Sequence, residues 1–200
     1  LNMNRKYAFV GLNGAGKTTI IKLLTGLYKD YNGTILVGGR DIKTLKEAEM
    51  KALFSVIYQD FAKYQISVLD NICLGSIGNC SDESVESVVK TIGISDLIAQ
   101  LPDGLNTNLG KIYENSIDIS GGEWQRIAMA RTLISGAPIY ILDEPTASLD
   151  PVAESQLYNN FQEVMDDKHL SILITHRLGA VRFIDEILVI EDGTVIERGT

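Results

Sequence analysis

The sequence feature that most restricts the fold is a glycine-rich segment between an apolar run and a helical pattern. Residues 11–18 read Gly-Leu-Asn-Gly-Ala-Gly-Lys-Thr, which fits G-x-x-x-x-G-K-[ST] at every fixed position. A strand is predicted over 7–10 and a helix over 17–26. Glycines allow successive N–H groups to turn inward, and a helix N-terminus adds partial positive charge. The segment therefore predicts a phosphate-binding loop.

The predicted loop supplies the first group of candidate ligands. Lys17 can neutralise the charge of β- and γ-phosphates, and the Thr18 hydroxyl can bind Mg²⁺. The residues expected to contact a nucleotide here are Asn13, Gly14, Ala15, Gly16, Lys17, Thr18 and Thr19.

A pair of carboxylates ends a second apolar strand, predicted over 139–142. Asp143 and Glu144 follow this strand directly. At the carboxyl edge of a parallel sheet, such a strand end points into the ligand crevice. We therefore expect Asp143 to hold Mg²⁺, through water, and Glu144 to accept a proton from the attacking water.

The whole pattern predicts an α/β fold with an inserted helical part. Wholly apolar strands indicate a mainly parallel sheet covered on both faces, and Asp192-Gly193 predicts a hairpin that adds an antiparallel edge strand. Strands are predicted at 7–10, 34–37, 53–58, 139–142, 171–175 and 186–190, and helices at 17–26, 82–92, 122–134 and 151–166. The segment 61–119 has few strand patterns, so we predict a core of 1–60 and 120–200 with a helical subdomain at 61–119.

Composition excludes several classes of protein. The 200 residues carry a net charge of −8, and every apolar stretch is shorter than the roughly 20 residues of a membrane span. A nucleic-acid partner is not expected, because the chain lacks a general basic surface. Residues 1–60 are nevertheless positive, at +4, which suits a phosphate ligand. The two cysteines, Cys73 and Cys80, are predicted to be reduced and to fill small apolar spaces.

Four further segments follow the loop and the acidic pair in a specific order. They are Gln59 after the strand 53–58, Ile119-Ser120-Gly121-Gly122-Glu123 with Gln125-Arg126, Ala147-Ser148-Leu149-Asp150, and His176 after the strand 171–175. Together with the loop and the acidic strand, they resemble the nucleotide-binding domain of ABC transporters from about residue 5 to residue 200. The resemblance implies a P-loop NTPase, or RecA-like, core with an inserted α-helical subdomain.

The resemblance also implies a mechanism. In this family, ATP with Mg²⁺ is enclosed between two domains packed head to tail, as a homodimer or heterodimer. Ser120, Gly121 and Gly122 would bind the γ-phosphate held by the partner domain, and Asp150, also a helix cap, would face the partner's phosphate loop. Gln59 would sense Mg²⁺ and the attacking water, and His176 would bind the γ-phosphate. A transmembrane domain is the second implied partner, at the cytoplasmic face of a membrane, while this chain by itself is expected to be soluble.

Three departures from the family pattern lead to further expectations. Glu123 stands where the family usually has glutamine, so we expect its carboxylate to point away from the phosphate site. Trp124 shares helical spacing with Ile127 and Ala128 and is predicted to pack inside. Only ten residues precede Gly11, so the aromatic residue that stacks on adenine is expected to be missing from a chain cut at both ends. We therefore predict weak nucleotide binding and little ATPase activity for this chain alone.

The sequence motifs are compatible with more than one kind of ABC protein. Asp70-Asn71-Ile72 and Thr107-x-Leu109-Gly110 are similar to exporter segments, which favours an exporter. Asp143-Glu144-Pro145-Thr146 is more typical of importers, although some peptide and bacteriocin exporters also carry it. An importer ATPase subunit and a soluble ABC ATPase without a transport role therefore stay open. A P-loop kinase is disfavoured, because a kinase has no use for residues 119–123.

Overall fold

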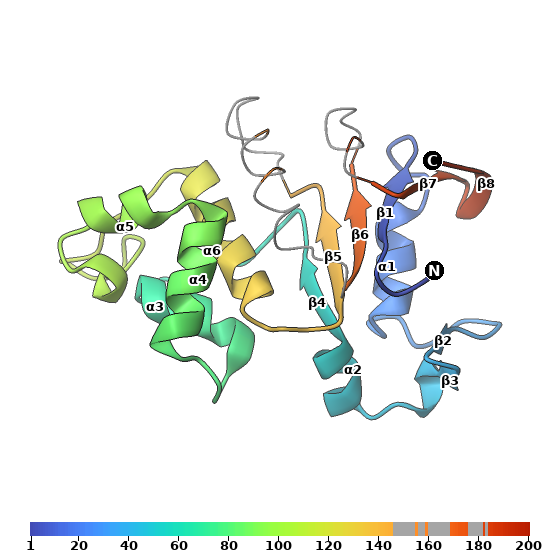
Figure 1. The fold of residues 1–200 in the computed structure, drawn as a ribbon, viewed down its shortest axis with the longest axis horizontal. Helices are drawn as coiled ribbons and strands as arrows, with labels where there is room; N and C mark the ends of the chain where they lie inside the picture. Colours follow the sequence, from blue (N-terminus) through green and yellow to red (C-terminus); the bar gives the residue numbers. More distant parts are fainter. Residues whose placement is uncertain (146–154, 156–158, 160–168, 176–181, 183) are drawn as a thin grey trace. The chain divides into compact units, whose positions relative to one another are not determined.

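The computed structural model describes residues 1–200 except 146–154, 156–158, 160–168, 176–181 and 183 (Figure 1). The chain divides into two compact units. The sheet unit consists of Leu1–Val56, Ala137–Asp143 and Asp167–Thr200. The helical unit consists of Ile57–Gly136 and Glu144–Asp166.

A six-stranded sheet has the order β4-β5-β6-β1-β7-β8. Its strands are β1 Lys6–Val10, β4 Phe54–Ile57, β5 Ile139–Asp143, β6 Leu170–Ile174, β7 Glu186–Glu191 and β8 Thr194–Gly199. β1 runs parallel to both β6 and β7, and β5 runs parallel to β6. β8 is the antiparallel edge strand. The predicted mainly parallel sheet with an antiparallel edge is therefore confirmed.

Burial follows the apolar pattern of the strands. Every residue of β5 and β6 is buried, as expected for central strands with both faces covered. In contrast, every residue of β8 is exposed, because this strand lies at the edge of the sheet. The apolar centres of the strands thus form the core, and this core fixes the positions of the polar residues at the strand ends.

The first third of the chain adds short elements to the sheet unit. They are α1 Lys17–Leu24, β2 Leu36–Val37, β3 Arg40–Asp41, the 3-10 turn η1 Ile42–Thr44 and α2 Glu47–Leu53. The strand predicted at 34–37 is shorter than expected, because the chain reverses at Gly38-Gly39 and pairs β2 with β3 in a separate hairpin. The helix α2 occupies a segment where the sequence predicted none.

The helical unit contains the predicted helix 82–92 with its predicted bounds. Its elements are α3 Val68–Cys73, η2 Leu74–Ser76, α4 Asp82–Ile92, α5 Ser95–Gln100, η3 Gly104–Asn106 and α6 Gly121–Leu133. The unit extends to Gly136, whereas the sequence placed the boundary of the helical subdomain at residue 119. The difference arises because α6 packs against α3 and α4. The predicted helix 151–166 lies almost wholly outside the described residues.

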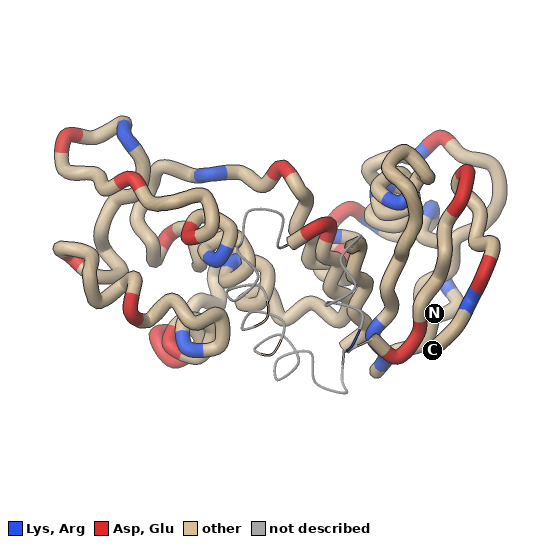
Figure 2. The backbone as a smooth tube through the Cα atoms, turned by 90° about the horizontal axis from the view of Figure 1, so that it is seen from above, with Lys and Arg blue, Asp and Glu red and all other residues tan. Residues whose placement is uncertain are grey.

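Charged positions are interspersed along the described backbone (Figure 2). Few of their side chains are buried. Among the described residues, the buried charged side chains are Lys17, Asp143 and Glu186. Glu186 lies between two cations, Arg5 and Arg198, which neutralise it. The other two are predicted site residues.

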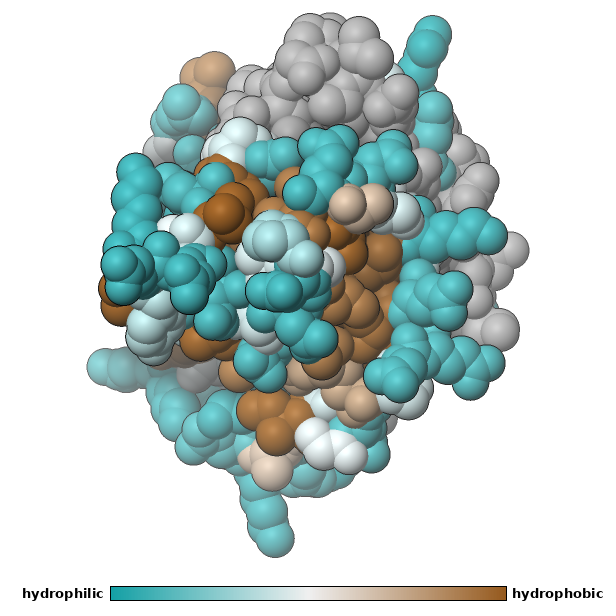
Figure 3. All heavy atoms as spheres, turned by 90° about the vertical axis from the view of Figure 1, so that its left-hand side faces the viewer, coloured by the Kyte–Doolittle hydropathy of each residue, from teal (hydrophilic) through white to brown (hydrophobic). Residues whose placement is uncertain are grey.

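Apolar side chains reach the surface of the helical unit. Tyr64, Ile77, Ile112 and Tyr113 are large exposed examples. Figure 3 shows the face on the left-hand side of Figure 1, where hydrophobic residues (brown) reach the surface between hydrophilic residues (teal). No helix in the described part of the chain is long and apolar enough to cross a bilayer.

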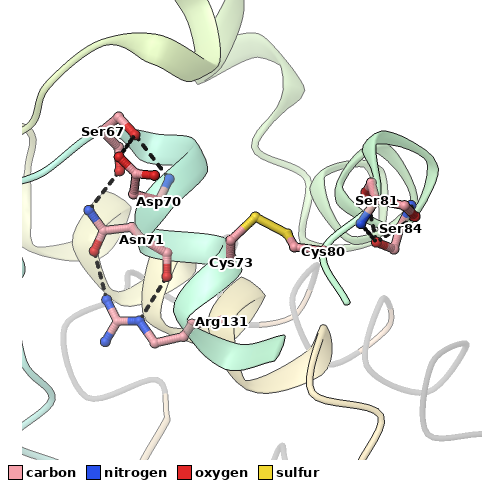
Figure 4. The surroundings of a disulfide bond; sticks show 8 residues. All are labelled: Ser67, Asp70, Asn71, Cys73, Cys80, Ser81, Ser84 and Arg131. Carbon is pink, nitrogen blue, oxygen red and sulfur yellow. Dashed lines mark hydrogen bonds between the residues drawn. A yellow bond between two sulfur atoms is a disulfide. The ribbon is translucent and has the colours of Figure 1, made fainter. Parts of the chain in front are cut away.

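The prediction that both cysteines are free is wrong. Cys73 and Cys80 form a disulfide that links the end of α3 to the segment before α4 (Figure 4). Ser81, the next residue, is the N-cap of α4 and accepts a hydrogen bond from the Ser84 N–H. The short spacing allows the bond because α3 ends before the chain turns back, which brings the two Cα atoms to 5.5 Å.

Candidate active site

The predicted phosphate loop connects the end of β1 to the start of α1. Inside the loop, the Ala15 N–H donates to the Leu12 carbonyl at 3.1 Å. Gly16 is the N-cap of α1 and adopts a left-handed conformation, with φ of 95°, which suits glycine. Its helix has no side-chain cap. The N–H groups of the first turn are therefore available to an anion.

Lys17 spans the loop from the first turn of α1. Its ammonium group donates to the carbonyl oxygens of Gly11, at 2.7 Å, and Leu12, at 2.9 Å. The residue is only 7% exposed. Because an ammonium group has three donors, one donor remains for a phosphate oxygen.

Thr18 and Asp143 join the loop to the acidic strand end. The Thr18 hydroxyl donates to Asp143 Oδ2 at 2.9 Å. Asp143 is 3% exposed at the end of β5. A hydroxyl and a carboxylate at this separation supply oxygen ligands of the kind that Mg²⁺ prefers. The two predicted metal ligands therefore fit a magnesium ion.

Glu144 follows Asp143 in an uncommon backbone conformation. Its φ is 48°, in the left-handed region that residues with a Cβ rarely adopt. The side chain is half-buried. Such conformations cluster at functional sites, because surrounding structure must hold them in place.

Ser120, Gly121 and Gly122 open helix α6. The Ser120 hydroxyl accepts from the Glu123 N–H at 3.3 Å, and the Glu123 carboxylate accepts from the Ser120 N–H at 2.7 Å. This reciprocal arrangement is a capping box. The unpaired N–H group at the helix start attracts the Glu123 carboxylate, and the expectation that this carboxylate points away from a bound phosphate stays a prediction.

Trp124 is buried, as predicted, at 3% exposure. Its indole N–H donates to Asp118 Oδ1 at 3.5 Å. A hydrogen bond from Lys111 lowers the pKa of Asp118, and the bond from Trp124 adds to this effect. The tryptophan thus packs inside while its polar edge is satisfied.

Gln59 is exposed in a bend just after β4, and Arg131 of α6 holds the segment that follows it. The Arg131 guanidinium donates to the Ala62 carbonyl at 3.2 Å and lies over the Tyr64 ring. It also donates to Asn71 Oδ1 at 2.8 Å and to the Asn71 carbonyl at 3.0 Å (Figure 4). We did not predict this role for Arg131. The sequence feature that could have indicated it is that Arg131 lies on the same face of the helix as the buried Trp124.

The predicted site residues are thus distributed over both units. The sheet unit brings together the loop, Lys17, Thr18 and Asp143, while Gln59, the 120–122 segment and Glu144 belong to the helical unit. Asp150 and His176 lie outside the described residues. Their predicted roles stay predictions.

Comparison with known proteins decides the family. The family model described as ABC transporter matches residues 1–147, more than half of the chain. The chain belongs to the ABC transporter family.

Two curated relatives of this ABC protein are named as a transport ATP-binding protein and a lipid flippase. The nisin transport ATP-binding protein NisT of Lactococcus lactis subsp. lactis is 38% identical over 194 residues, which cover 96% of this chain and 32% of that protein. The ATP-dependent lipid A-core flippase of Methylobacillus flagellatus is 36% identical over 195 residues, covering 98% of this chain and 33% of the relative. The chain thus spans about a third of their length.

A solved structure extends the likeness to three dimensions. It is described as a bacterial Atm1-family ABC exporter with ATP bound, and it superposes on this ABC domain with a TM-score of 0.91 at 34% identity. The match covers 100% of this chain and 34% of that one. The predicted fold class is therefore confirmed, and the solved structure that shows it belongs to an exporter by its description.

Proposed function

We propose that this chain is the domain that binds and hydrolyses ATP in an exporter-type ABC transporter. The observation that carries the proposal is the hydrogen bond between the Thr18 hydroxyl and the buried Asp143 carboxylate, beside a phosphate loop that Lys17 spans. This arrangement joins the two motifs that a nucleoside triphosphate site needs.

The loop would bind the β- and γ-phosphates of ATP. Backbone N–H groups of residues 13–19 and the uncapped start of α1 supply directed donors. The free donor of Lys17 would add a positive charge. Thr18 and Asp143 would hold Mg²⁺, which neutralises phosphate charge when bound.

Hydrolysis would depend on groups that position the attacking water. Glu144 would accept its proton, Gln59 would orient it, and His176 would bind the γ-phosphate. These three roles rest on the family resemblance. Phosphoryl transfer needs mainly positioning and charge stabilisation, so the proposal requires no further nucleophile in the protein.

A second nucleotide-binding domain would complete the site. The Ser120 oxygen accepts from the Glu123 N–H, so the Ser120 O–H group remains free to donate to a phosphate oxygen of the partner's ATP. The N–H groups of Gly121 and Gly122 lie at a helix start and favour an anion. Asp150 would face the partner's phosphate loop. A transmembrane domain is the remaining proposed partner.

The hydrolytic role is tested in the full-length transporter by Glu144→Gln and Lys17→Ala. We expect Glu144→Gln to bind ATP normally but to release phosphate at least about 10²-fold more slowly, because the general base is lost. Lys17→Ala is expected to lose ATP binding, measured by calorimetry. Undiminished phosphate release by Glu144→Gln contradicts the role of Glu144.

The dimer role is tested by Ser120→Arg with a matched control. Ser81→Arg removes the same kind of helix cap from α4, where Ser81 forms a capping box with Ser84. We expect only Ser120→Arg to abolish the ATP-dependent dimer, measured by cross-linking, while both variants still bind ATP. Equal dimerisation of the two variants would refute the role of Ser120.

A further inference from the structure

The turn between β7 and β8 lies against the phosphate loop. β1 pairs with β7 in parallel, with Val10 opposite Val189, and β1 ends there while β7 continues to Glu191. The end of β7 and the following turn therefore extend beside the loop. A Cβ atom placed on Gly11 would collide with the Ile190 carbonyl oxygen. The loop and the hairpin are thus in direct backbone contact.

One hydrogen bond fixes the turn to the middle of the loop. The Gly193 N–H donates to the Ala15 carbonyl oxygen at 2.8 Å. A Cβ atom placed on Gly16 would lie 3.2 Å from the Gly193 Cα, so this contact leaves little room for a side chain. Gly193 therefore contacts both residues of the Ala15–Gly16 peptide.

The geometry of the peptide group gives this bond a consequence on the other side of the loop. A trans peptide is planar, and its C=O and N–H groups point in opposite directions. Because Gly193 holds the Ala15 C=O toward the hairpin, the Gly16 N–H of the same peptide must point away from it. When the C=O of a peptide group accepts a hydrogen bond, the N–H of the same peptide group becomes more polarised and a better donor.

We propose that Gly193 is a positioning residue for the phosphates of ATP, because it fixes the orientation of the Gly16 N–H. The inference rests on the proposed function, in which this loop binds ATP. Lys17 holds the first part of the loop through the Gly11 and Leu12 carbonyls, and Gly193 holds the later part. The hairpin thereby contributes to nucleotide binding through its hydrogen bond to the loop.

The turn is built to present this N–H group. Asp192 and Gly193 both have positive φ, 47° and 74°, as the two central residues of a type I′ hairpin turn require. The register of β7 with β8 shifts between Val189 and Ile190, just before the turn. Both features set the direction in which the Gly193 N–H points.

The direct test removes only this donor. Glycolic acid replaces Gly193 by nonsense suppression in the full-length transporter, which changes the amide into an ester and deletes the N–H group. We expect the dissociation constant and KM for ATP to rise about tenfold, because the Gly16 N–H is then no longer held in the direction of the charged phosphate. kcat is expected to stay within about twofold, since the loss concerns binding.

Two controls separate positioning from stability of the hairpin. Gly193→Ala keeps the N–H group but strains the backbone, since alanine disfavours a φ of 74°. An ester at Thr194, which pairs with Glu191, alters the hairpin without touching the loop. We expect both to lower the melting temperature while the ATP dissociation constant changes less than about threefold.

Each outcome either supports the positioning role or overturns it. The proposal is overturned if the Gly193 ester binds ATP as tightly as the unmodified protein. It is also overturned if Gly193→Ala or the Thr194 ester loses as much affinity, because hairpin stability then explains the effect. If the unmodified transporter binds no ATP, the proposed function itself fails, and this result is read before any variant is compared.

Discussion

Replacing Arg131 by alanine should destabilise the helical unit more than the same change at Arg126 on the same helix. The guanidinium donates three hydrogen bonds, two to Asn71 and one to the Ala62 carbonyl. It also lies 4.5 Å from the centre of the Tyr64 ring. Asn71 itself is fully buried and donates to the carbonyls of Tyr64, Ile66 and Ser67. The change therefore opens a network that joins α6, α3 and the segment after Gln59.

The size of the effect follows from these contacts. Hydrogen bonds from a charged donor contribute about 1.5–3 kcal/mol each, but bonds that share one side chain are not additive. Loss of one partner from a buried charged network costs about 3–5 kcal/mol. Burial lowers the pKa of Arg131, but the residue is only partly buried, so the lower end of the range applies. We expect a loss of about 3 kcal/mol in the free energy of unfolding.

The assay is equilibrium unfolding in urea, combined with amide hydrogen exchange of residues 60–66. Arg126→Ala is the matched control on the same helix, because the hydrogen bond that Arg126 donates within the described part of the chain is a long, exposed one to the Gly93 carbonyl, at 3.4 Å. We expect the control to lose less than about 1 kcal/mol. A double-mutant cycle with Asn71→Ala should give a coupling energy of about 1–2 kcal/mol between the two side chains.

The role assigned to Arg131 is refuted if Arg131→Ala and Arg126→Ala destabilise the protein equally. It is also refuted if exchange of residues 60–66 is unchanged while global stability falls. The second result would mean that Arg131 stabilises α6 alone and leaves the segment after Gln59 unaffected.

Three further predictions concern other contacts of the helical unit. Cys73→Ser should lower the free energy of unfolding by about 2.5 kcal/mol under oxidising conditions, a value that follows from the loop closed by a disulfide at a sequence separation of 7. A reducing agent should lower the free energy of unfolding of the original protein by the same amount. Equal stability with and without reductant would contradict the bond to Cys80. Glu123→Ala should cost about 1 kcal/mol in urea unfolding through loss of the capping box, whereas Glu123→Gln should cost little; a neutral alanine variant would contradict the cap. The fluorescence of Trp124, the single tryptophan, should change on acidification only below the ordinary pKa of aspartate, about 3.9, because the pKa of Asp118 is lowered in the folded protein. The hydrogen bond between Asp118 and Trp124 is complete above the ordinary pKa and is lost as pH falls through the lower pKa of folded Asp118. Asp118→Asn should remove this transition, and a transition that persists in the variant would assign it to another group.

Local patterns predicted the parts of the site that lie in short continuous segments. The loop at 11–18 and the strand that ends in Asp143 each carry their function within a few residues, so their positions followed from spacing and from the rules of parallel sheets. Both Thr18 and Asp143 were assigned to Mg²⁺, but the direct hydrogen bond between them was not predicted. Apolar strand patterns also predicted the central strands.

Contacts made by backbone groups could not be predicted, because they leave no signature in the side chains. The hydrogen bond from Gly193 to Ala15 depends on how far β7 continues past β1, which only the folded sheet determines. The Cys73–Cys80 bond depended on the short length of α3. The capping role of Glu123 was not predicted, because only its charge beside the proposed phosphate ligand was considered.

The left-handed backbone conformation of Glu144 lowers the stability of the fold at a residue that is proposed to act in catalysis. A residue with a Cβ loses about 1 kcal/mol in this conformation, whereas asparagine adopts it more easily. Variants selected only for heat resistance should therefore favour asparagine at this position and discard the proposed general base. A directed-evolution experiment without a selection for activity would enrich proteins that are more robust and unable to turn over ATP. Under the proposed role of Glu144, activity and stability thus favour different side chains at this position.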